Sequence, residues 1–385
     1  MRRISILGVT GSIGANTVSV IDALGRHAFD VEAVTGHGNI QGLAEAAKHL
    51  DARIAVTADP ASLADLRAAL AGSEIEAAAG PEALVEAASR PVDWVMSAIV
   101  GAAGLAPTLA AARTGATIAL ANKETLVAAG GLFLAEIERS GATLLPVDSE
   151  HNALFQCMAA EKGPMERLLL TASGGPFRNH TLEQMRAVTV AEAVAHPNWS
   201  MGQRISIDSA SMFNKALEMI EAWHLFEVAP DQIEVLVHPQ SIVHSMAGFC
   251  DGTILAHLGP HDMRVAIGHT LSWPERRPLP VERLDFAKLA RLDFQEPDLA
   301  RFPSLGLARR AMVPGVAGAV LNGAHEVALD GFIDGRIGFL NMADVVSDTM
   351  DRLENLPLPR DLDDIYAADA EARRVGADLI RRIAA

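Results

Sequence analysis

Cysteines and long apolar runs are scarce in this sequence. Its 385 residues include two cysteines, Cys157 and Cys250, which lie far apart in apolar surroundings and form no metal-spaced motif. This pattern excludes a disulfide framework and indicates buried thiols in a reducing compartment. No stretch of about 18 apolar residues lacks a charge, and Met1-Arg2-Arg3 precedes no signal-peptide core. We therefore expect a cytoplasmic protein with no membrane partner.

Positive charge is also scarce. The chain has 32 Lys and Arg residues against 48 Asp and Glu residues, a formal net charge of −16. A nucleic-acid partner requires a basic surface that displaces counterions from phosphates, so this charge balance excludes nucleic acid. A small anionic ligand stays compatible with the sequence if positive charge is concentrated locally.

What the sequence does have is a large apolar fraction in an alternating pattern. Hydrophobic residues make up 50% of the chain, and its length predicts two or three domains. Strand candidates alternate with alanine-rich helical stretches over residues 1–148, which predicts a doubly wound, Rossmann-like α/β domain with a parallel sheet. The strand candidates are Ile4–Leu7, Val31–Val34, Ile54–Val56, Trp94–Ile99, Thr117–Ala121 and Thr143–Val147.

The pattern changes after this domain. Residues 149–274 combine strands with an amphipathic helix and a flap at 173–203, so we expect an α+β domain there. Residues 275–302 are rich in Pro and Arg and are predicted to form a linker, and residues 303–385 a bundle of helices. The expected elements of the middle domain are strands at Leu168–Thr171 and Ile233–His238, a hairpin of Val243–Phe249 with Thr253–Leu258, and a helix at Met212–Leu225.

A glycine-rich loop follows the first predicted strand. Its glycines, Gly8, Gly11 and Gly14, are spaced by three and open a helix. Glycine lets the backbone approach a pyrophosphate, and the helix N-terminus attracts negative charge, so this loop predicts a dinucleotide site. The spacing departs from G-x-G-x-x-G, and a purely structural turn is the alternative.

The end of the second predicted strand lacks an acidic residue. A site specific for NAD offers a carboxylate there to bind the ribose hydroxyls. This chain has Gly36-His37-Gly38-Asn39 instead, which favours NADP. An ordinary turn is the alternative.

Two carboxylates end the last strand candidate of the first domain. Asp148 and Glu150 flank Ser149, and alternate residues of a strand project to the same side. Carboxylates this close repel one another unless a hard divalent cation neutralises them, so the pair predicts a metal site. A solvated turn is the alternative.

A second polar cluster lies in the run from Asp208 to Glu218. Asn214, Lys215 and Glu218 are spaced to share a helix face, and Ser209 precedes them. Ser209, Asn214 and Lys215 make a plausible phosphate clamp, and Glu218 an oxygen ligand for the metal. A helix cap with one Lys–Glu pair is the alternative.

Lysine and loop residues complete the candidate site. Lys123, after the fifth strand candidate, lies at the edge of the sheet where ligands bind, and either holds an anionic group or forms an ion pair. Glycines bracket a segment that carries Trp199, as expected for a loop that closes over a ligand. The alternative is an ordered surface loop. The other histidines, His224, His238, His244, His257, His261 and His269, are expected to be mostly structural, with the alternative that His244 and Ser241 reach the site.

Taken together, these motifs closely resemble the 1-deoxy-D-xylulose 5-phosphate reductoisomerase family over essentially the whole chain. The motifs that carry the resemblance are Gly8–Gly14, Ala121–Glu124, Leu144–Ala153, Ser173–Arg178, His196–Gly202, Asp208–Glu218, His238–Met246 and Leu284–Phe286. The resemblance implies a homodimer that rearranges and reduces 1-deoxy-D-xylulose 5-phosphate to 2-C-methyl-D-erythritol 4-phosphate. It also implies NADPH and a divalent metal, Mg²⁺ or Mn²⁺ and in some cases Co²⁺, as cofactors.

The resemblance also implies a role for each candidate residue. It implies that metal is bound by Asp148, Glu150 and Glu218, and that the catalytic residues are these three with Lys123 and His196. Substrate contacts are implied for Lys123, Ser149, Glu150, Ser173, His196, Trp199, Ser209, Asn214, Lys215 and Glu218. Cofactor contacts are implied for Thr10, Gly11, Ser12, Ile13, His37, Gly38, Asn39, Asn122, Glu124 and Gly202.

Two segments depart from the family pattern. His37-Gly38-Asn39 replaces a G-x-N form of the ribose loop, and Asn322–Glu326 replaces an NAANE segment. The second segment is expected to affect packing more than chemistry. Two other functions stay open: a plain NADP-dependent sugar or hydroxy-acid dehydrogenase, which needs no metal, and a non-catalytic dinucleotide sensor.

Overall fold

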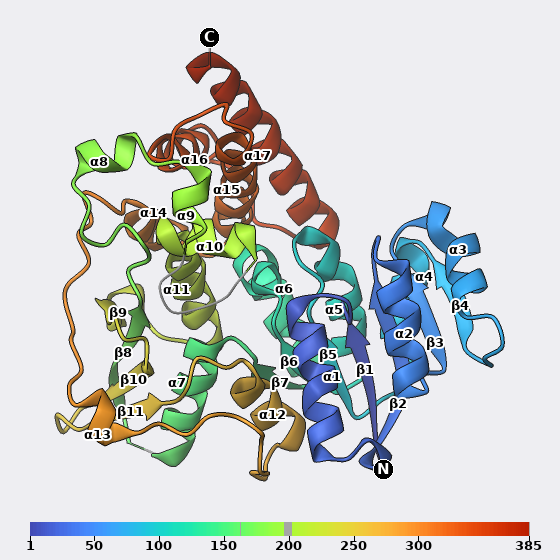
Figure 1. Cartoon of the computed structure of the whole chain (residues 1–385). Helices are drawn as coiled ribbons and strands as arrows, with labels where there is room; N and C mark the ends of the chain where they lie inside the picture. The colour runs from blue at the N-terminus through green and yellow to red at the C-terminus, as the bar shows by residue number, and fades with distance from the viewer. Residues whose placement is uncertain (162, 196–201, 385) are drawn as a thin grey trace. The chain divides into compact units, whose positions relative to one another are not determined.

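The computed structural model describes residues 1–161, 163–195 and 202–384 (Figure 1). The chain divides into two compact units. The first comprises Met1–Thr125, Phe133–Asn152 and Asp262–Glu282, and the second comprises Leu126–Leu132, Ala153–His261 and Arg283–Ala385.

The first unit is built on a parallel sheet of seven strands in the order β4-β3-β2-β1-β5-β6-β7. The chain starts at the central strand, builds outward on one side, and returns to build on the other. The switch point of this doubly wound sheet therefore lies between β1 and β5. The strands are β1 Arg2–Leu7, β2 Phe29–Gly36, β3 Ile54–Thr57, β4 Glu76–Ala79, β5 Trp94–Ser97, β6 Thr117–Leu120 and β7 Thr143–Pro146.

Helices cover both faces of this sheet, because right-handed crossovers place helices on opposite faces on either side of the switch point. Helix α12, from a later part of the chain, packs against α1 and the strands β6 and β7. The helices of this unit are α1 Ser12–Leu24, α2 Ile40–Leu50, α3 Leu63–Ala69, α4 Pro81–Ala88, α5 Leu105–Ala112 and α12 Arg264–Ser272. Two further helices, α6 Lys123–Ser140 and α7 Ser149–Ala160, have residues in both units.

The apolar strands explain why the first domain was predictable. Ile4, Ile6 and Leu7 on β1 are fully buried, as a strand covered on both faces requires. The six expected strands are all present. The sequence prediction missed β4, because its Glu-Ala-Ala-Ala has a low strand propensity and is only partly buried.

The second unit combines a smaller sheet with helices. The sheet has the order β11-β10-β8-β9, in which β8 is parallel to β9 and β10 is antiparallel to both of its neighbours. The predicted hairpin is present as β10 and β11. The elements are β8 Met165–Ala172, β9 Ile233–Val237, β10 Val243–Phe249, β11 Ile254–Leu258, α8 Leu182–Arg186, α9 Val190–Ala193, α10 Gln203–Ala210, α11 Phe213–Phe226 and α13 Phe286–Leu289.

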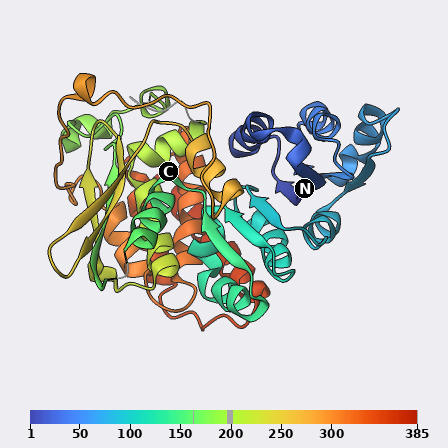
Figure 2. The same cartoon turned by 90° about the horizontal axis from the view of Figure 1, so that it is seen from below.

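The last part of the chain forms the expected helices: α14 Ser304–Ala311, α15 Ala317–Ile333, α16 Asn341–Arg352 and α17 Leu362–Ile383. Helix α15 packs against both α16 and α17 (Figure 1 and Figure 2). Glycines permit this close approach, because a Cβ at Gly323 would lie 2.9 Å from the Asp369 carbonyl oxygen. Among the described residues, no helix combines the length and the hydropathy that crossing a membrane requires.

The segment before these helices is tied to the second sheet. Gln295 forms an isolated antiparallel bridge with Val237 at the end of β9, with N···O distances of 2.8 and 2.9 Å. The ring of Phe294 stacks on His238 at a centroid distance of 4.7 Å. The predicted linker is therefore anchored along part of its length.

A close contact between α15 and α6 generates a stability prediction. A Cβ at Gly318 would lie 1.9 Å from the carbonyl oxygen of Val127. We expect Gly318→Ala to lower the free energy of unfolding by about 3 kcal/mol, because the added methyl group forces the two helix backbones apart. Chemical denaturation measures this change. Gly306→Ala is the matched control, because no described atom outside its own stretch of helix lies within 4 Å of its added Cβ. That variant should be stabilised by about 0.5–1 kcal/mol, and equal effects would contradict the packing argument.

The packing of His224 generates a pH prediction. Its ring contacts Trp223 at 4.4 Å and lies against Gly130, whose Cβ would come within 2.4 Å of Nε2. Burial lowers the pKa of His224 to about 4. The unfolded chain then binds more protons than the folded chain between about pH 4 and 6.5, so stability present above pH 6.5 should be lost as the pH falls.

Urea unfolding at pH 7 and pH 5 tests this linkage. Carboxylates also contribute to acid destabilisation, so the comparison is between the wild type and His224→Gln. The variant should show the smaller loss between the two pH values. Identical losses would mean that His224 keeps its ordinary pKa in the folded protein.

Candidate active site

The glycine-rich loop after β1 is packed too closely for side chains. Gly8 has φ +93°, and a Cβ there would lie 2.6 Å from the Ala98 carbonyl oxygen. A Cβ at Gly14 would lie 2.4 Å from the Gly8 carbonyl oxygen. Helix α1 begins at Ser12, and its N-cap residue is Gly11, which has no side chain to bond the first N–H groups of the helix. The loop therefore offers the close backbone and the helix N-terminus that a pyrophosphate requires.

The predicted ribose loop lies beside this glycine loop. A Cβ at Gly36, the last residue of β2, would lie 3.2 Å from the Thr10 hydroxyl. Thr57 Oγ1 donates to the His37 carbonyl at 2.9 Å, and Asn39 caps α2 by accepting from the Gly42 N–H at 3.0 Å. Apart from Gly38 itself and its chain neighbours, no atom of the described residues lies within 4 Å of a Cβ built at Gly38. Asn39 thus has a structural bond, while Gly38 faces open space.

Two predicted cofactor residues brace the loop after β5. Asn122 caps α6 by accepting from the Thr125 N–H at 2.8 Å, and its amide donates to the carbonyls of Ile99 and Gly101. Glu124 Oε1 accepts from the Gly101 N–H at 2.9 Å. These bonds fix the carboxyl edge of the sheet near the switch point.

The expected strand geometry at Asp148 is wrong. Strand β7 ends at Pro146 and α7 begins at Ser149, so Asp148 lies between them. Its Oδ1 accepts from the N–H of Glu150 at 3.1 Å and of His151 at 3.4 Å, which makes it the cap of α7. The pairing of β7 with β6 stops after the Val147 N–H donates to the carbonyl of Leu120, the last residue of β6. Asp is a favoured helix cap, so it starts α7 there. Asp148 and Glu150 are therefore held by a helix start and not by strand alternation.

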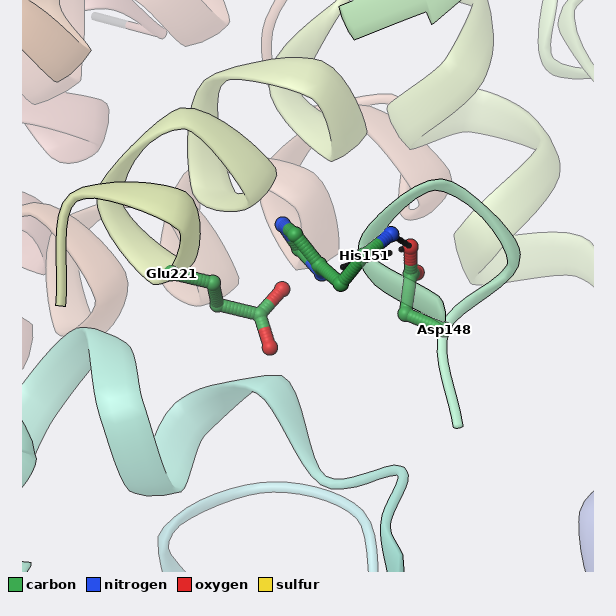
Figure 3. Close-up of side chains that lie close together, drawn as sticks. All are labelled: Asp148, His151 and Glu221. Carbon is green, nitrogen blue, oxygen red and sulfur yellow. Dashed lines mark hydrogen bonds and ion pairs between the residues drawn. The ribbon is translucent and has the colours of Figure 1, made fainter. Parts of the chain in front are cut away.

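Asp148 also has two basic neighbours. Its other oxygen pairs with Lys123, and both side chains are about 15% exposed, at 16% and 15%. His151 Nδ1 lies 3.4 Å from Oδ1, as Figure 3 shows by a dashed line. Lys123 therefore forms the ion pair that the sequence left as one of two alternatives. Glu221, also labelled in Figure 3, belongs to the second unit.

Sequence reasoning missed two buried residues beside Asp148. His151 is fully buried, and Asn152, which is 2% exposed, donates to the Pro146 carbonyl at 2.9 Å. Asn152 Nδ2 also lies 3.1 Å from His269 Nδ1. Burial, with a smaller effect of Arg276, lowers the pKa of His269 to about 4, so this ring nitrogen accepts at neutral pH. The sequence feature that could have identified His151 and Asn152 is their position directly after Asp148-Ser149-Glu150.

In the second unit, a glycine turn brings two predicted substrate residues to one place. Gly175 has φ +61°, and a Cβ there would lie 2.9 Å from the Ser209 carbonyl oxygen. The Gly175 N–H donates to Ser173 Oγ at 3.1 Å. The turn after β8 therefore packs on the end of α10, with Ser173 and Ser209 on adjoining segments.

Helix α11 carries the second polar cluster. Asn214 Nδ2 donates to Glu218 Oε1 at 2.6 Å, and Lys215 forms an ion pair with Oε2 of the same carboxylate. Lys215 is 3% exposed and Glu218 is fully buried. The three side chains share one face, as their spacing predicted. Burial of a charged pair is tolerated only because each charge has a partner.

The segment Asn322–Glu326 contributes a hydrogen bond as well as packing contacts. His325 Nε2 donates to Asp208 Oδ1 at 2.7 Å, and its ring stacks on Phe213 at a centroid distance of 4.0 Å. This bond joins the segment to the polar cluster of the second unit, because Asp208 directly precedes Ser209. The two residues of the bond are 117 positions apart, and no local pattern connects them.

Two predicted residues, His196 and Trp199, lie outside the described residues. Gly202 is described and is the N-cap of α10, where Ser206 Oγ donates to its carbonyl at 2.9 Å. Ser149 Oγ donates to Glu150 in the first turn of α7.

Comparison with known proteins finds matches along nearly the whole chain. Family models match for 1-deoxy-D-xylulose 5-phosphate reductoisomerase at residues 4–130, for its C-terminal domain at residues 144–226, and for the DXP reductoisomerase C-terminal domain at residues 258–375. The 1-deoxy-D-xylulose 5-phosphate reductoisomerase of Rhizobium meliloti (strain 1021) is 62% identical over 383 residues, which cover 99% of this chain and 98% of that protein.

Solved structures agree with these matches. The reductoisomerase from Zymomonas mobilis in complex with NADPH is 50% identical, with a TM-score of 0.92 over 98% of this chain and 99% of that chain. A DOX-P reductoisomerase in complex with NADPH, fosmidomycin and magnesium is 40% identical, with a TM-score of 0.93 over 99% of this chain and 98% of that chain. Because sequence, domain models and backbone agree over nearly its full length, this chain belongs to the 1-deoxy-D-xylulose 5-phosphate reductoisomerase family.

Proposed function

We infer that this chain catalyses the NADPH- and metal-dependent conversion of 1-deoxy-D-xylulose 5-phosphate to 2-C-methyl-D-erythritol 4-phosphate, a step in isoprenoid precursor synthesis. The observation on this chain that carries the inference is Glu218, a fully buried carboxylate held by Asn214 and Lys215 on one helix face. A plain dehydrogenase transfers hydride without such a carboxylate. A dinucleotide sensor has no use for it either.

We propose that Asp148, Glu150 and Glu218 bind one divalent cation. All three offer carboxylate oxygens, the donors that Mg²⁺ and Mn²⁺ prefer. A bound cation of this kind polarises the substrate carbonyl and stabilises negative charge on the neighbouring oxygens during carbon–carbon rearrangement. The helix cap at Asp148 and the bonds to Glu218 hold these oxygens before the cation binds.

The lysines balance the carboxylates in this proposal. Lys123 pairs with Asp148, so it keeps an ammonium group beside the metal site and is placed to hold a substrate oxygen. An ammonium has three donors, so Lys215 can contact Glu218 and a phosphate oxygen together. Ser173, Ser209 and Asn214 add uncharged donors, which complete a clamp for the substrate phosphate. Ser149 is placed to contact the substrate from the first turn of α7.

NADPH supplies the hydride that reduces the aldehyde formed by the rearrangement. We propose that the backbone of Thr10 to Ile13 holds its pyrophosphate and that residues 37–39 surround the 2′-phosphate. Asn122 and Glu124 support this site by fixing the loop after β5. Gly202 is proposed as a further cofactor contact.

Other proposals extend this function. His196 and Trp199 are proposed to contact the substrate from a flap at residues 173–203 that closes and excludes water. We also propose a homodimer in the cytoplasm. Its domains are proposed as residues 1–148 for NADP, 149–274 for catalysis, a linker at 275–302 and a helical domain at 303–385.

The metal proposal predicts loss of NADPH oxidation in excess EDTA and its return with Mg²⁺ or Mn²⁺. Glu218→Gln should lower kcat by at least about 10²-fold, the scale of losing one preorganised electrostatic group. Glu227→Gln, at the exposed end of the same helix, is the matched control and should keep its activity. Undiminished turnover with chelator would favour the plain dehydrogenase, and a fully active Glu218→Gln would leave that residue a structural role.

The ribose-loop proposal predicts a preference for NADPH over NADH that can be changed at Gly38. Among the described residues, only its chain neighbours lie within 4 Å of a Cβ added at Gly38, and its φ is not left-handed, so a side chain can be introduced there without strain. Gly38→Asp should lower the ratio of kcat/KM for NADPH to that for NADH, because a carboxylate repels the 2′-phosphate. Gly38→Arg should raise it. If neither variant moves the ratio, the loop does not contact the 2′-phosphate.

A further inference from the structure

We propose that His325 is a positioning residue for the phosphate clamp: it holds together the two sides of the corner between α10 and α11. This inference rests on the proposed function, because the clamp residues Ser209, Asn214 and Lys215 flank that corner. Ser209 lies in the last turn of α10 on one side, and Asn214 and Lys215 lie in the first turn of α11 on the other.

His325 contacts both sides of this corner. Its Nε2 donates to Asp208 Oδ1 at 2.7 Å, just before Ser209. Its ring stacks on Phe213, just before Asn214, with an interplanar angle of 20°. Between the two contacts lies Met212, a non-glycine residue with φ +60°. A left-handed residue of this kind is held by its surroundings and not by its own preference.

Helix α15, which carries His325, is also held by contacts with α17 that do not involve the corner. Arg373 on α17 donates to Glu326, the next residue along α15, at 2.5 Å, and to Asp369 at 2.6 Å. Gly323, two residues before His325, packs directly on α17. Ser304 Oγ donates to the Ser211 carbonyl at 3.0 Å and adds a second bond from the C-terminal helices to the corner. The clamp is therefore attached to the helical domain.

Packing alone does not account for a histidine at this position. His325 is 2% exposed, and its Nδ1 has no hydrogen-bond partner among the described residues. A phenylalanine would give the same stack on Phe213 without a bare buried nitrogen, whose desolvation is unfavourable. The bond from Nε2 to Asp208 is the interaction that the histidine supplies and a phenylalanine would not. That bond sets where Ser209 lies relative to Asn214 and Lys215.

Two substitutions at His325 separate positioning from packing. His325→Phe keeps the stack and removes the donor, whereas His325→Gln keeps a donor near Nε2 and removes the stack. We expect His325→Phe to raise KM for 1-deoxy-D-xylulose 5-phosphate about tenfold and to leave KM for NADPH unchanged. His325→Gln should stay close to the wild type. The opposite order, or equal rises in both variants, would overturn the proposal.

A second variant and a second readout make the test independent of turnover. Asp208→Ala breaks the same bond from the other side, so it should raise KM like His325→Phe, and the double variant should be no worse than either. Inorganic phosphate should raise the melting temperature of the wild type and His325→Gln, but not of His325→Phe. If the wild type binds phosphate but does not turn over the sugar phosphate, the proposed function is refuted and the positioning role of His325 is not. A wild type with no phosphate response, or additive effects in the double variant, would refute the positioning role.

Discussion

A fully buried carboxylate, Glu218, is the constraint on which the rest of the site depends. Removing one partner from a buried ion pair is destabilising by about 3–5 kcal/mol, because the remaining charge is then uncompensated. The chain meets this requirement locally, since Asn214 and Lys215 lie three to four residues earlier on the same helix. The start of α11 is thereby fixed, and with it the corner that carries Ser209. The geometry of the proposed phosphate clamp and the stability of the first turns of α11 therefore depend on the same contacts.

The charge distribution follows the same principle. The chain has a formal net charge of −16, yet Asp148 and Glu218 each pair with a lysine. Each pair keeps a cation beside a carboxylate that we propose as a metal ligand, so in this proposal an anionic substrate meets positive charge where a surplus of acidic residues would otherwise repel it. The cations are thus placed where an anionic substrate needs them.

Local patterns predicted much of this structure, and what they missed has both local and long-range causes. The glycine spacing, the apolar strands of the first domain and the shared face of Asn214, Lys215 and Glu218 follow from neighbours in the sequence, and the structure has them. Strand β4 was missed because alanines carry little strand signal. At Asp148, the strand prediction failed because Pro146 ends β7 and Asp148 then caps α7. The bond between His325 and Asp208 joins residues too distant for any periodicity to connect. The first two failures have local causes, a weak strand propensity and a helix cap, and only the third depends on packing between distant segments.

Direct measurement of metal binding tests the central claim, that Asp148, Glu150 and Glu218 hold one divalent cation. Electron paramagnetic resonance can follow free Mn²⁺ during titration of the wild type and of Glu218→Gln, without dependence on turnover. The account predicts one Mn²⁺ bound per chain in the wild type and a much weaker site in the variant, in which an amide replaces a charged ligand. Equal affinity and stoichiometry in the two proteins would show that Glu218 is not a ligand and would contradict the account.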